Sequence, residues 1–271
     1  MDETEEGRTS LPPPLYGQAV ITDQQGRLYT VGGTSGFTYF MDVHMLDFKL
    51  SPPRWSCLYR LSGVSGEPEP RYRHELCLWE DQLIVLGGGT SFSADTFQFL
   101  PTFNISRREW TRTRTRPDPT ATIDMSEDGF PDRRRCHSAV QQGENVWIFG
   151  GYDGTEIFGD IWQLHLPSRQ WRRLSQELPV PVYFHAMTVS EEGRMVMFGG
   201  VDDIDNNTRT NCVFSCWLSI PSLRSMAWEA LCHYTPDIGS LPSGVLVEQG
   251  VPRDCVDLLD SQETVSQAEC G

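Results

Sequence analysis

The sequence predicts an all-β protein built from about four β-propeller blades, followed by a short helical segment. The main observation is a repeat. Glycine doublets occur at Gly32-Gly33, Gly87-Gly88, Gly150-Gly151 and Gly199-Gly200, spaced 49 to 63 residues apart. Each doublet follows an apolar run and precedes a tryptophan, and each repeat holds about four strand-sized runs. Because a propeller blade is a four-stranded sheet repeated at such a period, we assign blades to residues 15–220.

The first run of each repeat is expected to form the innermost strand of its blade. It carries Gln18, His74, His137 or His185, thirteen or fourteen residues before the first glycine. Three histidines at equivalent positions could converge on a metal ion. Repetition at one blade position favours a structural role, such as a hydrogen bond to a neighbouring blade, so we predict no metal and no cofactor.

The second run of each repeat is apolar almost throughout, reading LYTV, LIVL, VWIF and MVMF. Such a run is typical of a strand that is covered on both faces, as it would be between neighbouring blades. The glycines that follow suit a place where backbones crowd and a side chain does not fit. The late tryptophans provide large areas for packing between blades. They are Trp55, Trp110, Trp171 and Trp217.

The two ends of the chain differ from the repeats. Residues 1–14 are acidic and proline-rich and are expected to be disordered, and residues 260–271 are expected to form a flexible tail. Residues 221–259 lose the strand pattern. Ser222 is a suitable N-cap there, and the residues after it place an apolar stripe on one helical face. That stripe consists of Leu223, Met226, Ala227, Ala230 and Leu231.

Composition and charge exclude several classes of function. A formal charge of −15 disfavours nucleic acid and anionic membranes as partners. The chain has no run of eighteen apolar residues, and its acidic start does not read as a signal peptide. Eight cysteines without a C-x-x-C pair favour free thiols in the cytoplasm, the nucleus or both. No nucleophile, phosphate-loop or dinucleotide motif is present, so we predict that the chain is not an enzyme.

Arginine and tyrosine gather before the first strand of each blade. Two basic tripeptides, RYR at 71–73 and RRR at 133–135, stand there, and Tyr16 and Tyr183 occupy the corresponding places in the other two repeats. Near the axis of a propeller they would form a cationic, aromatic-edged cup that pairs with carboxylates. The alternative is that these arginines tie adjacent blades together. Both roles stay open for each residue, with Arg73 and Arg135 as the best candidates for the cup.

A more specific likeness extends over about residues 15–259. It is carried by the segments LYGQAV…LYTVGGTSG, RYRHE…LGGGTS, RRRCHS…GGYDG…GDIWQL and PVYFH…WLSIPSL…AWEAL. They resemble the kelch-repeat substrate receptors of elongin-dependent cullin–RING ubiquitin ligases. The resemblance implies a kelch propeller that captures proteins by C-terminal tails ending in glycine. It also implies a C-terminal box that binds elongin C, with elongin B, and the cullin-2 scaffold.

Carried onto this sequence, the resemblance implies two sets of site residues. The substrate set is Arg71, Tyr72, Arg73, Ser91, Arg134, Arg135 and Tyr183. The elongin and cullin docking set is Leu223, Ala227, Leu231, Leu241 and Pro242. Ala227 stands where the family favours cysteine, and Gly244 predicts that the second box helix is short.

The main departure from the family is the number of repeats, six in the family and four here. The four blades either close on themselves or form an incomplete six-bladed ring, as in a truncated form of the protein. A second function therefore stays open: a kelch-repeat scaffold that binds a signalling enzyme, such as a phosphatase or a kinase, without a role in ubiquitin transfer. An enzyme that uses the propeller channel is disfavoured, because a Cys-Tyr-His copper set and paired carboxylates are missing at matching blade positions.

Overall fold

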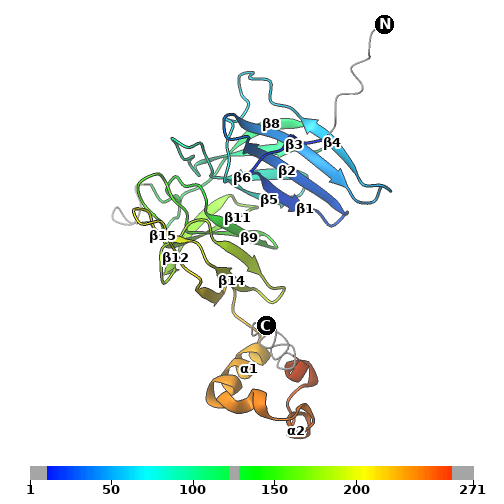
Figure 1. Ribbon diagram of the computed structural model, residues 1–271, viewed down its shortest axis with the longest axis vertical. Coiled ribbons are helices and arrows are strands. Elements are labelled where there is room, and N and C mark those ends of the chain that lie inside the picture. Colours follow the sequence, from blue (N-terminus) through cyan, green and yellow to red (C-terminus); the bar gives the residue numbers. More distant parts are fainter. Residues whose placement is uncertain (1–10, 122–127, 258–271) are drawn as a thin grey trace. The chain divides into compact units, whose positions relative to one another are not determined.

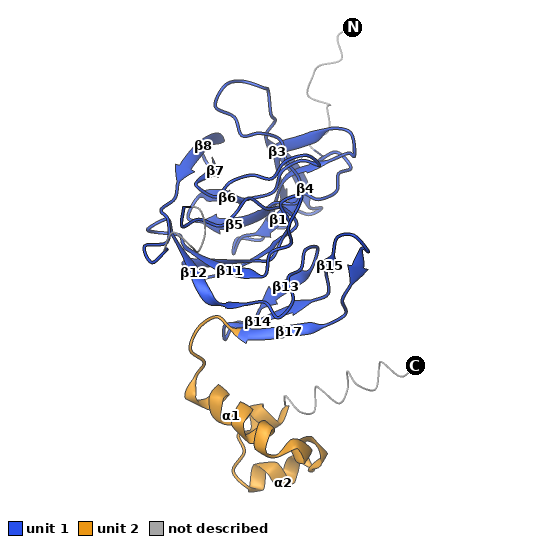
Figure 2. Cartoon of the chain, turned by 90° about the vertical axis from the view of Figure 1, so that its left-hand side faces the viewer, with its two compact units in different colours: residues 1–216 blue, residues 217–271 orange. Residues whose placement is uncertain are grey.

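The computed structural model describes residues 11–121 and 128–257 (Figure 1). Most of the 1–14 segment and all of the 260–271 segment, both predicted to be unstructured, lie outside the described residues. The chain divides into two compact units, residues 1–216 and residues 217–271 (Figure 2). No helix in the described part of the chain has the length and apolar character needed to cross a lipid bilayer.

The first unit has the predicted propeller arrangement of four blades. Three of them are four-stranded antiparallel sheets whose strands follow one another in chain order. The first contains β1 (Ala19–Thr22), β2 (Arg27–Thr34), β3 (Tyr39–Asp47) and β4 (Arg54–Tyr59). The second contains β5 (Glu75–Trp79), β6 (Gln82–Leu86), β7 (Phe99–Asn104) and β8 (Glu109–Arg114). The third contains β9 (Ser138–Gln142), β10 (Asn145–Phe149), β11 (Asp160–His165) and β12 (Gln170–Glu177).

The fourth blade departs from this pattern. Its main sheet has three strands, β13 (Ala186–Val189), β14 (Arg194–Phe198) and β17 (Val213–Trp217). The segment between β14 and β17 forms a separate ribbon of β15 (Val201–Asp203) and β16 (Thr208–Arg209). The predicted late tryptophans all fall in the last strand of their blade, at β4, β8, β12 and β17.

In the second blade, β6 packs against both neighbouring blades, as its apolar sequence predicts. One core cluster joins the first and second blades, and another joins the second and third. Val31, Leu86 and Phe149 hold equivalent positions before their doublets, and each is 0% exposed. Phe198 holds the same position in β14 but is 54% exposed, because no described sheet covers that side of the fourth blade.

The glycine doublets are explained by the histidines. A Cβ added to Gly32 would lie 2.7 Å from the Cε1 of His74 in the next blade, and one added to Gly87 would lie 2.7 Å from the Cε1 of His137. The second glycine is crowded by its own blade's histidine, since a Cβ on Gly88 would lie 2.5 Å from the Cβ of His74. His74 Nε2 also lies 3.1 Å from the carbonyl oxygen of Val31. The predicted structural role is thus confirmed for His74.

The second unit is a small helical cluster. It contains α1 (Leu223–Tyr234), a 3-10 turn at Pro236–Ser240, and α2 (Ser243–Glu248). Ser222 caps α1 as predicted, because its Oγ accepts a hydrogen bond from the Ser225 N–H at 3.0 Å. Ile238, Leu246 and Val256 form a core with its own partly buried partners. The second helix is short, six residues, as the position of Gly244 predicts.

Candidate functional site

The inner strands of the four blades are preceded by residues with left-handed backbone. Gly17, Arg73, Cys136 and Phe184 have φ values of 67°, 56°, 58° and 59°. Hydrogen bonds join them in sequence, from Arg73 N to Gly17 O at 2.7 Å, from Cys136 N to Arg73 O at 3.0 Å, and from Phe184 N to Cys136 O at 3.0 Å. This chain of bonds fixes where each blade presents its side chains toward the axis.

A cavity of about 610 Å³ opens at this point, within the propeller unit. Its charged lining residues are Arg73, Glu75 and Arg209. Burial raises the pKa of Glu75 to about 8, so this carboxyl is mostly protonated at neutral pH. The two arginines therefore make the cavity cationic in a chain whose formal charge is −15. Such a cavity suits an anionic group.

Arg73 is the predicted residue that the structure places best. Its guanidinium carbon lies 4.6 Å from the centroid of the Phe184 ring. Its Nε is buried and has no hydrogen-bond partner among the described residues. A buried donor without a partner is costly, and a carboxylate would satisfy it with a charge-assisted bond.

Arg135 and Tyr183 do not line the cavity, and Arg135 is only 8% exposed, but ring contacts connect both to Arg73. The guanidinium carbon of Arg135 lies 5.3 Å from the Tyr152 ring centroid, and its Nη1 donates to the carbonyl of Ser93 at 3.3 Å. Tyr152 stacks on Tyr183 at 5.1 Å between centroids, and Tyr183 contacts Phe184 at 5.0 Å. A continuous row of rings therefore connects Arg135 to Arg73.

Tyr72 and Ser91 take part in a second group of contacts. The Tyr72 ring lies 5.4 Å from Tyr39 and 6.3 Å from Tyr16, between ring centroids. The Tyr39 hydroxyl accepts a hydrogen bond from the Ser91 N–H at 2.9 Å and lies 2.7 Å from Ser91 Oγ. We call the surface formed by Tyr39, Tyr72, Arg73, Arg135 and Tyr183, with their contacting rings, the arginine–tyrosine face.

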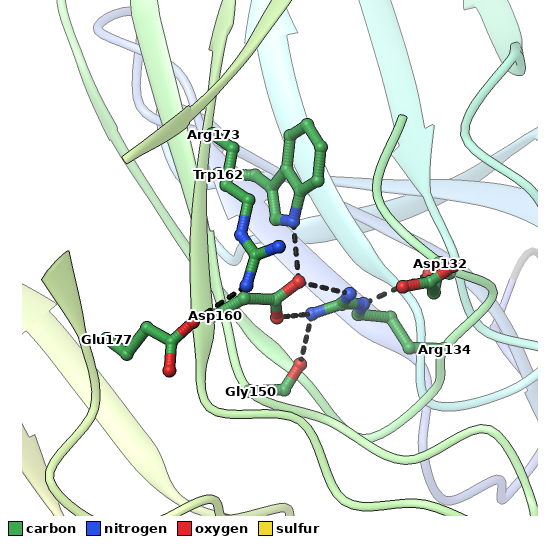
Figure 3. Close-up of polar contacts among 7 residues, drawn as sticks. All are labelled: Asp132, Arg134, Gly150, Asp160, Trp162, Arg173 and Glu177. Carbon is green, nitrogen blue, oxygen red and sulfur yellow. Dashed lines mark hydrogen bonds and ion pairs between the residues drawn. The ribbon is translucent and has the colours of Figure 1, made fainter. Parts of the chain in front are cut away.

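Arg71 and Arg134, which were also predicted for substrate binding, do not lie on this face. Both are buried. Arg134 donates to the Gly150 carbonyl at 3.0 Å and forms a two-point ion pair with Asp160, whose other donor is the Trp162 indole N–H at 2.6 Å (Figure 3). Arg71 repeats the motif, with Gly87 and Asp95 each at 3.1 Å. Arg71 and Arg134 therefore connect segments of their own blade. The prediction that these two arginines face the substrate is corrected.

The correction follows from a shift of register between the two basic tripeptides. Arg71 is equivalent to Arg134, and Arg73 is equivalent to Cys136, because Arg71 and Arg134 make the same contacts and Arg73 and Cys136 share the left-handed backbone. RYR therefore aligns with RRC at 134–136, and Arg133 lies outside the repeat. Sequence reasoning missed Glu75, Arg209, Tyr39 and Tyr152. The two tyrosines follow glycine doublets, which was the available signal.

The docking residues predicted for the helical unit are exposed. Leu223 is 82% exposed, no residue of α1 is buried, and Ala227, Leu231, Leu241 and Pro242 are all exposed. The cluster core is built from other residues, Ile238, Leu246 and Val256. The apolar stripe of α1 is therefore not needed for the small core beneath it.

The repeats match a family model. Residues 121–239 match the KLHDC2/KLHL20/DRC7 Kelch-repeats domain. The chain thus carries kelch repeats. Its relatives include kelch domain-containing protein 10 of Xenopus laevis, 38% identical over 252 residues, which are 93% of this chain and 59% of that protein.

Two further relatives bear the same name. Kelch domain-containing protein 10 of Homo sapiens is 38% identical, with 93% of this chain and 55% of that protein covered. The homolog from Drosophila melanogaster is 35% identical, covering 93% of this chain and 43% of that protein. The kelch resemblance predicted from the sequence is thus confirmed. The chain spans less than two thirds of the length of these kelch relatives.

Proposed function

We propose that this kelch protein is a substrate-recognition subunit of a cullin–RING E3 ubiquitin ligase. In this proposal the propeller binds C-terminal tails that end in glycine, and α1 with the start of α2 binds elongin C, in its complex with elongin B, and cullin-2. The observation that carries the proposal is that the chain has two exposed features, each in a different compact unit. One is a cationic cavity in the propeller, and the other is an apolar helix face in its own compact unit.

The cavity supports recognition of a terminal carboxylate. Arg73 provides a buried, unpaired Nε–H, and Arg209 adds a second positive charge. A carboxylate pairs well with a guanidinium fork. The protonated state of Glu75 at neutral pH leaves this attraction unopposed from within the cavity.

The helical unit supports docking to a partner. Leu223, Ala227 and Leu231 are spaced at four-residue intervals, so they lie in one row along α1. An exposed apolar row on a helix is the feature that helix-in-groove binding uses. Because the row is not part of the unit's core, it can be altered without unfolding the unit.

Co-purification tests the docking half. The double variant L223A/L231A should lose elongin B/C and cullin-2 from affinity-purified complexes, while its melting temperature stays within about 2 °C of wild type. V213A changes an exposed aliphatic residue of the propeller and should keep both partners. Retention of the ligase subunits by L223A/L231A would contradict the docking proposal. Recovery of a phosphatase or kinase without ligase subunits would favour the scaffold function.

Peptide binding tests the recognition half. A glycine-ending peptide with a free carboxylate should bind, and its C-terminal amide should bind much more weakly. R73A should cost about 1.5–3 kcal/mol, the range for a hydrogen bond to a charged group. R112A removes an arginine with a similar ring contact, 5.1 Å from Phe99 on the outer strand side, and should leave binding unchanged.

A further inference from the structure

Two phenylalanine side chains stand almost completely in solvent beside the arginine–tyrosine face. Phe37 is 98% exposed and Phe92 is 97% exposed. Each lies in the loop that follows a glycine doublet, the first between β2 and β3 and the second between β6 and β7. Burying an aromatic side chain is favourable, so two such exposed rings on adjacent blades are a feature typical of a binding surface.

Both loops are held by hydrogen bonds of the same kind. In the first loop, Thr34 Oγ1 accepts from the Gly36 N–H at 3.0 Å and donates to the Thr38 carbonyl at 2.8 Å. In the second, Thr90 Oγ1 accepts from the Phe92 N–H at 3.2 Å. The two rings are therefore presented by ordered turns, which lowers the entropy cost of burying them against a partner.

The two loops are tied to each other and to the arginine–tyrosine face. Ser91, next to Phe92, is bonded to the hydroxyl of Tyr39, which closes the first loop. The Ser93 carbonyl accepts from Arg135. Tyr39 in turn contacts Tyr72, the neighbour of Arg73. The phenylalanine pair is thus continuous with the face that leads to the cationic cavity.

The loops of the other two blades differ. In the third blade, Asp153 accepts from the N–H groups of Thr155 and Glu156 at 2.6 and 2.8 Å, so the turn is closed by an acidic residue and carries no phenylalanine at its tip. In the fourth blade the corresponding tip carries Ile204, which is 37% exposed. The face is therefore asymmetric, with its most apolar edge at the first two blades.

We propose that Phe37 and Phe92 form a second anchor for the protein tail whose terminal carboxylate binds at Arg73. This inference rests on the proposed function and narrows its substrate class to C-terminal tails that carry an apolar side chain upstream of the end. The tail runs from the cavity over Tyr72 and Tyr39 and places that side chain between the two phenylalanines.

The geometry sets where the apolar residue must be. An extended peptide advances about 3.3 Å per residue, so the 5.4 Å between the Tyr72 and Tyr39 rings takes up about two residues. The apolar residue is therefore expected at least three positions before the last residue. The aromatic lining of this route favours apolar over charged side chains along the tail.

A peptide library provides the test. Peptides with a fixed C-terminal glycine, a free carboxylate and about ten random preceding positions are selected on the immobilised full chain. Wild type should enrich Leu, Ile, Met or Phe at least three positions upstream of the glycine. The double variant F37S/F92S should lose this enrichment and bind the selected peptides at least tenfold more weakly.

F48S is the matched control. Phe48 is also exposed on the first blade, but it lies in the turn between β3 and β4, at the opposite end of β3 from Phe37. F48S should bind the selected peptides with wild-type affinity. Thermal melts of all variants check that the propeller is intact.

The outcomes separate the two proposals. If carboxylate-dependent peptides are selected without an upstream apolar preference, and F37S/F92S binds them normally, the second anchor is wrong and the proposed function stands. If the selected peptides bind equally well as C-terminal amides, the proposed carboxylate recognition is wrong, and the assignment of the partner as a C-terminal tail falls with it.

Discussion

Replacing Arg134 by methionine should destabilise the propeller severely. Arg134 is 0% exposed and makes a two-point ion pair with Asp160, with Nη2 to Oδ2 at 2.9 Å. In R134M the Asp160 carboxylate stays buried, with the Trp162 N–H as its main remaining donor. Removing one partner of a buried ion pair costs about 3–5 kcal/mol, a large part of the 5–15 kcal/mol that holds a typical domain folded.

The equivalent change one blade earlier should cost less. Arg71 pairs with Asp95 through a single 3.1 Å contact, and the Asp95 side chain is 35% exposed, so water can solvate it once the arginine is gone. The pKa values agree with this difference. Burial tends to raise both carboxyl pKa values. At Asp160, Arg134 together with the Trp162 N–H and the charge of Arg173 outweighs burial and lowers the pKa, whereas Asp95 keeps a raised pKa. R71M should therefore cost about 1–2 kcal/mol.

Urea denaturation followed by near-ultraviolet circular dichroism measures both free energies of unfolding. The double variant R134M/D160L should recover part of the loss, since it leaves no unpaired charge. The lowered pKa of Asp160 means that its ionised form stabilises wild type above the unfolded pKa, and this stabilisation is lost as the pH falls through the folded pKa. R134M lacks this contribution, so its free energy of unfolding should fall less at acid pH than that of wild type. If R134M lowers the free energy of unfolding no more than R71M does, Arg134 does not stabilise the propeller through a buried ion pair, and the reasoning is refuted.

Three further predictions concern packing, backbone and pH. F149A should cost about 3–5 kcal/mol in unfolding free energy and F198A less than about 1.5 kcal/mol, because only Phe149 is fully enclosed; equal losses would contradict the described packing. G87A should destabilise far more than G63A in thermal melts: both have positive φ, but a Cβ at Gly87 would meet three groups at 2.7 Å, while one at Gly63 would meet nothing within 4 Å. E75Q should become increasingly stabilising relative to wild type as the pH rises from the ordinary pKa of a glutamate toward the folded pKa of about 8, because over this range the unfolded chain ionises Glu75 while the folded protein keeps it protonated; pH-independent stability differences would speak against a buried, protonated Glu75.

Much of the fold was predictable because it depends on local patterns. The apolar runs, the doublets and the late tryptophans recur in sequence, and each is a strand, a strand end or a last-strand residue in the structure. The cap at Ser222 and the exposed stripe after it were also predictable, because capping and helical periodicity need only neighbouring residues. The divided fourth blade was not, since its strand pairing depends on contacts between distant segments.

The sequence by itself determined the repeat, the blade count and the residue types gathered at the mouth of the propeller. Only the tertiary structure decided which arginines are available. Arg71 and Arg73 are two residues apart, yet the first is buried against Asp95 and the second borders the cavity. The physical reason is that the left-handed residue before each inner strand sets the direction of its neighbours. The carboxylates that satisfy Arg71 and Arg134 lie about 24 to 26 residues further along the chain, in the loop before β7 and in β11 respectively.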